Sequence, residues 1–255
     1  MNIDAGKATN STGITIAGEL KELIEAAFRA IKKAGELIDM RKHKGEYPSM
    51  GAKDICLLIA VANISMEETV LYAQQLAKRV KEALHLPGYL YEAAQLGKHC
   101  SNLSPLCAGE YESFAKKIQL PEWKPDYGPQ IFDVKRGATV MGARDFLVAL
   151  DVNLNTTGTR RANAIAFNIR EAGRNVEQNG LKIDIPGTLK AVKGIGWFIQ
   201  EYGIAQISIN LTNTSITPIH IAFDEICRKA DARGIRIMGR ELVGLIPLKA
   251  MLDAG

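Results

Sequence analysis

The sequence lacks the features that mark membrane, secreted or metal-stapled proteins. No uninterrupted apolar run approaches the roughly 18 residues that a membrane-spanning helix requires. The first residues show neither the apolar core of a secretory signal nor the arginine-rich pattern of a transit peptide. The four cysteines, Cys56, Cys100, Cys107 and Cys227, form no Cys-x-x-Cys pair, which argues against a disulfide framework and a zinc ribbon. We therefore expect a cytoplasmic protein with free thiols, no membrane contact and no metal site.

The sequence also lacks an excess of one charge. Its 32 Lys and Arg residues against 28 Asp and Glu residues leave a net charge of only +4. Basic residues alternate with acidic ones and form no stripe that could follow a nucleic-acid backbone, so we expect small anionic ligands and no nucleic acid. With 255 residues, 47% of them hydrophobic, the chain can bury a substantial core as one large domain or as two smaller subdomains.

Helix and strand patterns alternate along the chain, which predicts an α/β or α+β fold in which helices cover sheets. Apolar residues at three- and four-residue spacing predict a first helix, and Ser65 with Glu68 forms a capping box at the start of a second. Three prolines between residues 121 and 136 predict an irregular connection, and we place a subdomain boundary between residues 141 and 142. The elements expected before this boundary are helices over 20–38 and 65–84 and strands over 55–61 and 89–91.

The second half repeats the alternation. Thr217 and Pro218 suit the N-cap and first turn of a helix, and Gly173 and Gly234 suit helix ends. The run 193–196 lacks the third glycine of a dinucleotide-binding motif, so we interpret it as a tight turn. The expected elements are strands over 146–154, 189–192, 205–211 and 235–238, helices over 160–172, 197–202 and 218–233, and a polar loop over 174–184.

A polar loop over 39–51, between the first predicted helix and the first predicted strand, gathers the residue types that bind anions. It contains Arg41, Lys42, His43 and Lys44. Loops held by rigid elements often carry binding sites, but charge clusters are more often simply solvent-exposed. The pattern alone leaves both interpretations open.

Several segments spread along the chain match the motifs of one family. The segments are 4–6, 37–48, 108–112, 126–129, 142–149, 190–197 and 242–248. Together they resemble the glutamate formimidoyltransferases, the transferase half of formimidoyltransferase-cyclodeaminase. The resemblance covers nearly the whole chain.

The resemblance implies an α+β fold, an α/β sandwich, of two subdomains over residues 1–141 and 142–255. Each would be a mixed β-sheet covered by helices, and the two would face each other across a ligand tunnel. The implied reaction transfers a formimidoyl group from N-formimidoyl-L-glutamate to tetrahydrofolate, the co-substrate, in histidine degradation. No metal takes part, and the expected assembly is a homodimer. Compared with the family, we expect the first strand and helix before Asp4 to be missing, and no cyclodeaminase domain to follow the helix that starts at Pro247.

The resemblance also implies the site residues. Where the family has its catalytic histidine, this chain has Tyr47, while Asp4 matches an acidic active-site residue and His43 is a second acid/base candidate. A free tyrosine titrates near pH 10, so it is a poorer base at neutral pH than histidine. The candidates for binding substrate carboxylates are Arg41, Lys42, Lys44 and Arg144.

A second segment resembles the folate-contacting loop of the family. Its residues are Gly128, Pro129, Gln130, Ile131, Phe132, Asp133, Val134, Lys135, Arg136 and Gly137. Elsewhere, Cys107 and Ser49 replace arginines of the family, which removes side chains that bind carboxylates in a bidentate manner. Two interpretations therefore stay open: an active transferase, or a catalytically impaired paralogue or fragment that retains folate binding or acts as a partner subunit.

Overall fold

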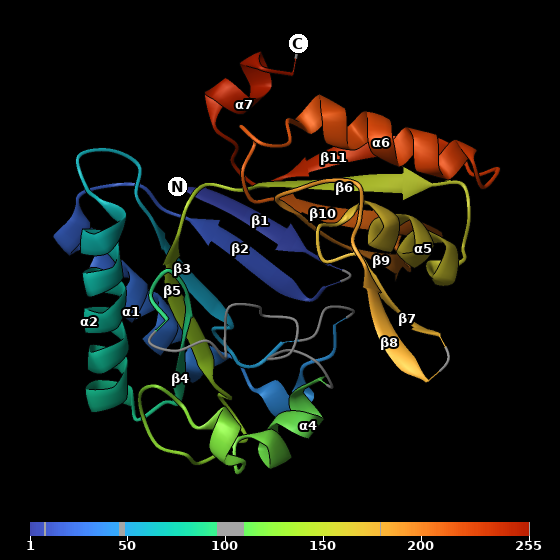
Figure 1. Cartoon of the computed structure of the whole chain (residues 1–255). Coiled ribbons are helices and arrows are strands. Elements are labelled where there is room, and N and C mark those ends of the chain that lie inside the picture. Colours follow the sequence, from blue (N-terminus) through green and yellow to red (C-terminus); the bar gives the residue numbers. More distant parts are fainter. Residues whose placement is uncertain (8, 46–48, 96–109, 179, 255) are drawn as a thin grey trace. The chain divides into compact units, whose positions relative to one another are not determined.

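The computed structural model describes residues 1–7, 9–45, 49–95, 110–178 and 180–254 (Figure 1). Its helices and strands confirm the predicted α+β fold. The chain forms two compact units, one of Met1, Thr9–Ser11 and Ile16–Asp145, the other of Asn2–Ala8, Thr12–Thr15 and Phe146–Gly255. The assignment of residues 1–141 and 142–255 to two subdomains stays a prediction, as does the tunnel between them. No helix in the described part of the chain has the length and apolar character to cross a membrane.

The first unit is built on a three-stranded parallel sheet with the order β3–β5–β4 (Figure 1). Its strands are β3 (Ile55–Ile59), β4 (Gly88–Glu92) and β5 (Thr139–Arg144). Its main helices are α1 (Leu20–Leu37), α2 (Met66–Leu84) and α4 (Glu110–Lys117). Alternate side chains of the strands point to opposite faces, so Leu90 and Met141 pack with α1 and α2, whereas Tyr89 and Val140 pack with Phe114 of α4. Helices therefore cover both faces, as is usual for parallel strands.

The predicted helices of this unit and the predicted capping box are confirmed. The Ser65 hydroxyl accepts a hydrogen bond from the Glu68 backbone N–H (3.1 Å), and the Glu68 carboxylate accepts one from the Ser65 N–H (2.9 Å). The central strand β5 was not among the predicted strands, because Gly142 interrupts its apolar run. A Cβ atom on Gly142 would overlap the carbonyl oxygen of Tyr91 on the neighbouring strand. The predicted boundary between residues 141 and 142 falls inside this strand.

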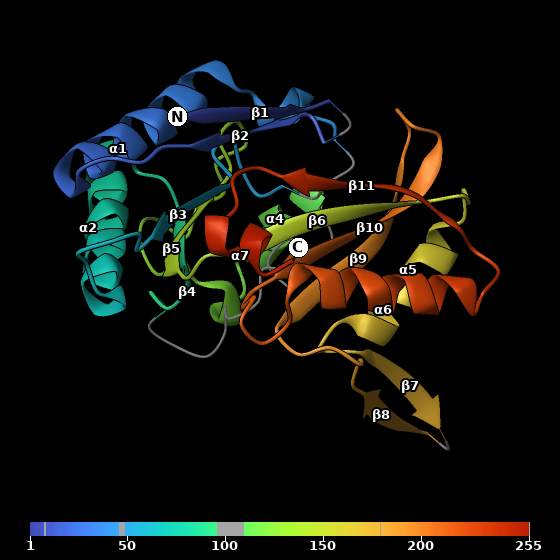
Figure 2. The same ribbon diagram turned by 90° about the horizontal axis from the view of Figure 1, so that it is seen from above.

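The second unit is built on a four-stranded antiparallel sheet with the order β11–β6–β10–β9. Its strands are β6 (Val148–Leu154), β9 (Val192–Ile199), β10 (Ile204–Leu211) and β11 (Ile237–Val243). The helices α5 (Thr159–Ile169) and α6 (Ile219–Asp231) both lie on the same side of this sheet (Figure 2), and a short helix, α7 (Leu248–Leu252), ends the unit. Val152 and Ile207, which lie opposite each other on β6 and β10, belong to the core beneath the helices. The described strands are thus parallel in one unit and antiparallel in the other, where the resemblance implied a mixed sheet in each.

Several local predictions were wrong. The strands β7 (Arg174–Gln178) and β8 (Leu181–Ile185) pair in antiparallel fashion where a loop over 174–184 was expected. The expected strand over 189–192, turn over 193–196 and helix over 197–202 give way to the single strand β9. The glycines misled the prediction: a Cβ atom on Gly196 would overlap the backbone of α5, so this glycine permits close packing of helix on sheet. A further unpredicted hairpin joins β1 (Asn2–Gly6) and β2 (Ser11–Thr15).

Candidate functional site

Two loops that the sequence separates by almost a hundred residues meet in the first unit. They are the signature loop (residues 39–51, of which 46–48 lie outside the described residues) and the 128–137 segment. The Met40 N–H donates to the Lys135 carbonyl oxygen (2.9 Å), and the Ala138 N–H donates to the Met50 carbonyl oxygen (3.0 Å). Gly51 and Gly137 form an isolated antiparallel bridge. The structure therefore brings together the two segments in which most candidate residues were predicted.

Glycine is required where the two loops touch. Gly137 has a φ angle of 72°, a left-handed conformation that side chains with a Cβ atom seldom adopt. A Cβ atom at this position would also overlap the Met50 carbonyl oxygen, and one on Gly51 would overlap the Ala138 carbonyl oxygen. The close approach of the two backbones therefore depends on both glycines.

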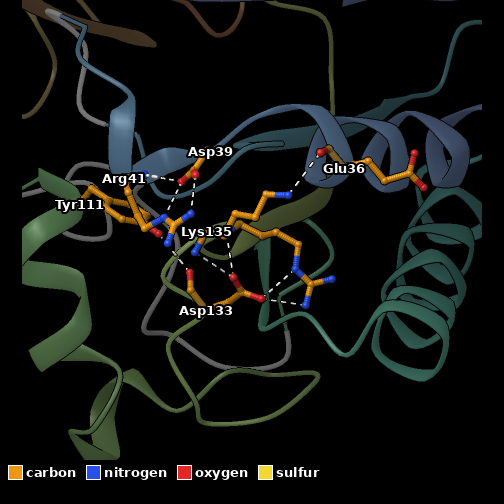
Figure 3. A network of polar contacts seen from close by, with 7 residues as sticks. Glu36, Asp39, Arg41, Tyr111, Asp133 and Lys135 are labelled. Atoms are coloured by element: carbon orange, nitrogen blue, oxygen red, sulfur yellow. Dashed lines mark hydrogen bonds and ion pairs between the residues drawn. The ribbon is translucent and has the colours of Figure 1, made fainter.

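Arg41, a predicted ligand of substrate carboxylates, pairs with a carboxylate of its own loop (Figure 3). Its Nε atom lies 2.8 Å from Asp39 Oδ1, and one terminal nitrogen lies 2.6 Å from Asp39 Oδ2. The side-chain hydrogen bonds from Arg41 lower the pKa of Asp39 to about 2. Asp39 is thus a permanent anion at neutral pH, and a substrate carboxylate that binds Arg41 competes with it. Lys42 and Lys44 of the same loop are exposed.

The cations of the 128–137 segment bind the ends of helices. Lys135 Nζ lies 3.3 Å from the Glu36 carbonyl oxygen in the last turn of α1, and the Arg136 guanidinium donates to the Leu84 carbonyl oxygen at the end of α2 (3.1 Å). Cations suit helix C-termini, where carbonyl oxygens lack helical partners. Arg136 also binds Asp133 (2.7 Å). Burial raises the pKa of Asp133, but hydrogen bonds from the backbone and side chain of Arg136 outweigh this effect and hold the pKa below its ordinary value.

Tyr111 joins this network, although sequence reasoning gave it no role. Its hydroxyl donates to the Asp133 carbonyl oxygen (3.0 Å), as Figure 3 shows, and its ring lies 5.0 Å from that of Phe132. Burial and the nearby carboxylates raise the pKa of Tyr111 to about 12, so its hydroxyl stays a hydrogen-bond donor at neutral pH. Its place in the motif 108–112 was the available signal.

A hollow lies beside the 128–137 segment, within the first unit. Its volume is about 980 Å³, and its second wall is the C-terminal end of α2 with Lys81, Glu82 and His85. The predicted folate-binding residues that line it are Gly128, Pro129, Ile131, Phe132, Asp133 and Val134. The remaining members of the segment have structural partners, including Gln130, whose amide donates to the Ile118 carbonyl oxygen (2.8 Å). The hollow is open to solvent, and its lining combines apolar side chains with four polar or charged ones, Lys81, Glu82, His85 and Asp133.

The family models decide what the chain is related to. The formiminotransferase domain, N-terminal subdomain, matches residues 1–144, and the formiminotransferase domain matches residues 149–255. The chain belongs to the formiminotransferase family. The resemblance that its motifs indicated is therefore confirmed.

Relatives of this family align with the whole chain. The formimidoyltransferase-cyclodeaminase of Gallus gallus is 46% identical over 254 residues, which are 100% of this chain and 46% of that protein. The glutamate formimidoyltransferase of Thermoplasma acidophilum is 35% identical over 255 residues, or 99% of this chain and 80% of that protein. The glutamate formimidoyltransferase of Streptococcus pyogenes is 35% identical over 244 residues, which are 96% of this chain and 77% of that protein. The chain spans about half the length of the cyclodeaminase relatives.

The acid/base candidates of the family motif are only partly described. Tyr47 lies outside the described residues, as does Cys107. His43 is half-buried, and its Nδ1 atom lies 3.4 Å from the Asn10 amide, which also donates to the Lys44 carbonyl oxygen (3.0 Å). Its Nε2 atom is buried and has no hydrogen-bond partner in the part of the chain that the structure describes. The acid/base role given to His43 stays a prediction.

Two candidates lie away from the formiminotransferase signature loop. Arg144 ends β5, about 20 Å along the strand from Ala138, where the two loops meet. Burial lowers the pKa of Arg144, and its Nε atom has no hydrogen-bond partner among the described residues. Asp4 is exposed on β1 and belongs to the second unit. The roles given to both residues stay predictions.

Neither cysteine nor metal chemistry is indicated by the described residues. Cys56 and Cys227 are free thiols, and burial raises the pKa of each, which keeps both protonated. Over the described ranges, no three His, Cys, Asp or Glu side chains gather closely enough to hold a metal ion.

Proposed function

We propose that the chain catalyses folate-dependent transfer of a formimidoyl group from N-formimidoyl-L-glutamate to tetrahydrofolate, in histidine degradation. The observation that carries the proposal is the junction of the signature loop with the 128–137 segment, beside a hollow that six of the predicted folate-binding residues line. The family assignment supports it, since two aligned relatives carry the name glutamate formimidoyltransferase. A homodimer in the cytoplasm is the expected assembly and location.

In the proposed reaction, a ring nitrogen of tetrahydrofolate attacks the formimidoyl carbon, and a tetrahedral intermediate forms. The bond between that carbon and the glutamate nitrogen then breaks. The proton lost by the ring nitrogen goes to the departing amine, so the products are formimidoyl-tetrahydrofolate and glutamate. A group that passes this proton works best with a pKa near the working pH.

Three residues of the chain are proposed for this proton transfer. Tyr47 occupies the family's histidine position, and His43 has a buried ring nitrogen without a hydrogen-bond partner in the described part of the chain. Asp4 matches an acidic residue of the family's active site. Because tyrosine normally titrates near pH 10, we expect slow turnover with Tyr47 in place. Substrate carboxylates would bind the exposed cations of the signature loop, Lys42 and Lys44, more readily than Arg41, which Asp39 already occupies.

A second candidate function is a catalytically impaired relative that still binds folate or serves as a partner subunit. Tyr47, Ser49 and Cys107 favour it, since each replaces a family residue that would serve catalysis or carboxylate binding. The two candidates differ in turnover but agree on folate binding.

Formimidoyl transfer by the purified chain and by its Tyr47→His variant tests the proposal. Circular dichroism must show that both proteins are folded. A general acid/base group typically contributes about 10²- to 10⁴-fold in rate, so we expect slow transfer by the natural chain and a gain of that order in the variant. Transfer by the variant alone would favour the impaired relative, whereas no transfer by either folded protein would contradict the proposed activity. Equal rates would contradict the role given to residue 47 and make His43→Ala the next variant.

A further inference from the structure

Two residues just before β2 lie against the signature loop. Thr9 and Asn10 belong to the first unit, as the loop does. A Cβ atom on Gly45 of the loop would overlap the Thr9 carbonyl oxygen, so the two backbones touch at a point where only glycine fits. Asn10 has a φ angle of 49°, a left-handed conformation that asparagine adopts more readily than most other residues. From this turn the Asn10 side chain reaches the loop.

The Asn10 amide nitrogen faces acceptors on two successive residues of the loop. It donates to the Lys44 carbonyl oxygen (3.0 Å) and lies 3.4 Å from His43 Nδ1. The Lys44 carbonyl group fixes the direction in which the amide points, because the reverse orientation would bring two oxygen atoms together. One N–H group of the amide is thus used by Lys44, and the other is directed at His43 Nδ1.

This contact distinguishes the two tautomers of His43. A neutral imidazole carries one hydrogen, either on Nδ1 or on Nε2. An N–H group can donate to Nδ1 only when Nδ1 itself carries no hydrogen, and a hydrogen on Nδ1 would set two donors against each other. The Asn10 amide therefore favours the tautomer of His43 with its hydrogen on Nε2.

The backbone of His43 is held by the junction of the two loops. Its N–H group donates to the Met40 carbonyl oxygen (3.2 Å) at the end of the short 3-10 helix Met40–Lys42. The Met40 N–H group in turn donates to the Lys135 carbonyl oxygen (2.9 Å). Since the junction holds the backbone and Asn10 holds one side of the ring, the position of Nε2 is fixed as well.

The Nε2 atom of His43 carries the hydrogen in this tautomer but has nothing to donate it to within the described residues. Nε2 is buried, and no hydrogen-bond partner for it lies in the described part of the chain. Buried N–H groups in native proteins nearly always have an acceptor, because desolvation without a hydrogen bond is unfavourable. The Nε2–H group is therefore a donor that is available to a ligand.

We propose that Asn10 is a positioning residue that keeps the hydrogen of His43 on Nε2, so that His43 donates a hydrogen bond to an oxygen acceptor of a bound reactant. The inference rests on the proposed function, whose two reactants both carry carboxylate or carbonyl oxygens. It narrows the role of His43, because a nitrogen that already carries a hydrogen does not take a proton from the attacking ring nitrogen. That proton then depends on position 47, and Tyr47 is a poor acceptor for it.

NMR of the full chain with isotopically labelled histidine reads the tautomer from the signals of the ring nitrogens. The chain has four histidines, so a His43→Gln variant identifies the signals of His43. Spectra are recorded at about pH 8, where free imidazole is almost entirely neutral. Asn10→Asp replaces the N–H donor by an acceptor, and Asn10→Gly permits the left-handed turn without an amide. The matched control is Asn175→Asp on the exposed strand β7.

We expect the hydrogen on Nε2 in the natural chain and in Asn175→Asp, and on Nδ1 in Asn10→Asp. Asn10→Gly should show both tautomers, and it provides the test if Asn10→Asp fails to fold. N-formimidoyl-L-glutamate or tetrahydrofolate, each added alone, should shift the Nε2 signal, and the reactant that does so supplies the acceptor. A hydrogen on Nδ1 in the natural chain, one tautomer in all folded variants, or an Nε2 signal that neither reactant shifts would overturn the inference.

Formimidoyl transfer is measured for the same substitutions in the Tyr47→His background. Asn10→Asp should lower the rate of transfer by roughly tenfold, the usual effect of one lost hydrogen bond, and Asn175→Asp should leave it unchanged. A changed tautomer without any loss of transfer would overturn the donor role of His43. Absence of transfer from every folded protein, with the tautomers as expected, would contradict only the proposed function. Transfer with tautomers that do not depend on Asn10 would contradict only the role of Asn10.

Discussion

Asp151 should make the second unit less stable as the pH rises. Burial and Glu241 raise the pKa of this carboxyl group from its ordinary value of 3.8 to about 6. Between these two values the native state binds more protons at Asp151 than the unfolded state does, so the free energy of unfolding falls with increasing pH. A difference of about two pKa units corresponds to ~3 kcal/mol. The free energy of unfolding has fallen by this full amount once the pH lies above the native pKa of about 6.

The Asp151→Asn variant removes this dependence, because asparagine resembles the protonated carboxyl group and does not titrate. Near pH 4, where native Asp151 is protonated, we expect the variant and the natural chain to differ little in their free energy of unfolding. At pH 8, the free energy of unfolding of the variant should be higher by ~3 kcal/mol. The altered hydrogen bond with Ser208 reduces this gain. A stabilising substitution at a buried polar position would itself indicate that the carboxylate is kept for function.

Urea unfolding at pH 4, 5, 6, 7 and 8 measures this difference. The chain has two tryptophans, and Trp197 lies in β9 of the second unit. Placing each variant in a Trp123→Phe background lets fluorescence report the second unit alone, which matters if the two units unfold separately. Asp184→Asn, the same substitution on the exposed strand β8 of the second unit, serves as the control and should show the pH dependence of the natural chain. A difference in the free energy of unfolding between Asp151→Asn and the natural chain that stays constant from pH 4 to pH 8 would show that Asp151 does not cause the pH dependence.

Three further predictions concern the first unit. Gly137→Ala should lower the free energy of unfolding by about 2 kcal/mol or more in urea titrations. The alanine would have to adopt a left-handed φ angle, and its Cβ atom would overlap the Met50 carbonyl oxygen. Gly203→Ala, where φ is also positive but nothing lies within 4 Å, should cost clearly less, and equal losses would contradict the close-contact explanation. Tyr111→Phe should cost ~1 kcal/mol through the lost hydrogen bond to Asp133, and no change in the urea midpoint would count against that bond. Arg136→Lys keeps the positive charge but loses the contact of two guanidinium nitrogens with Asp133, so the thermal midpoint of the variant should fall. An unchanged midpoint would show that the positive charge alone stabilises this position.

Local patterns in the sequence predicted the elements whose signal is local. Helices α1 and α2 show apolar residues at helical spacing, and the Ser65 capping box was read correctly from two residues. Strand β10 was recognised from its alternating residues. The contact between the signature loop and the 128–137 segment was not predicted, since their pairing depends on where β5 places the chain.

The misread elements depend on distant neighbours. In the sequence, Gly142 and Gly196 have the pattern of strand breaks. In the structure each lies within a strand, at a point where a neighbouring backbone leaves no room for a Cβ atom. The hydrogen bond from Lys135 to the end of α1 was likewise not predicted, because ninety-nine positions separate Lys135 from Glu36. The role of Lys135 as a folate contact stays a prediction. The polar contacts around Asp151 were not predicted, because Asp151, Gln206 and Glu241 come from three strands that only the register of the sheet brings together.

The most direct test of the proposed activity is glutamate release from N-formimidoyl-L-glutamate by the purified natural chain, with and without tetrahydrofolate. We expect slow release that requires tetrahydrofolate, with one formimidoyl-tetrahydrofolate formed for each glutamate released. Release that proceeds equally without tetrahydrofolate, or no release by a folded chain, would contradict the proposed activity.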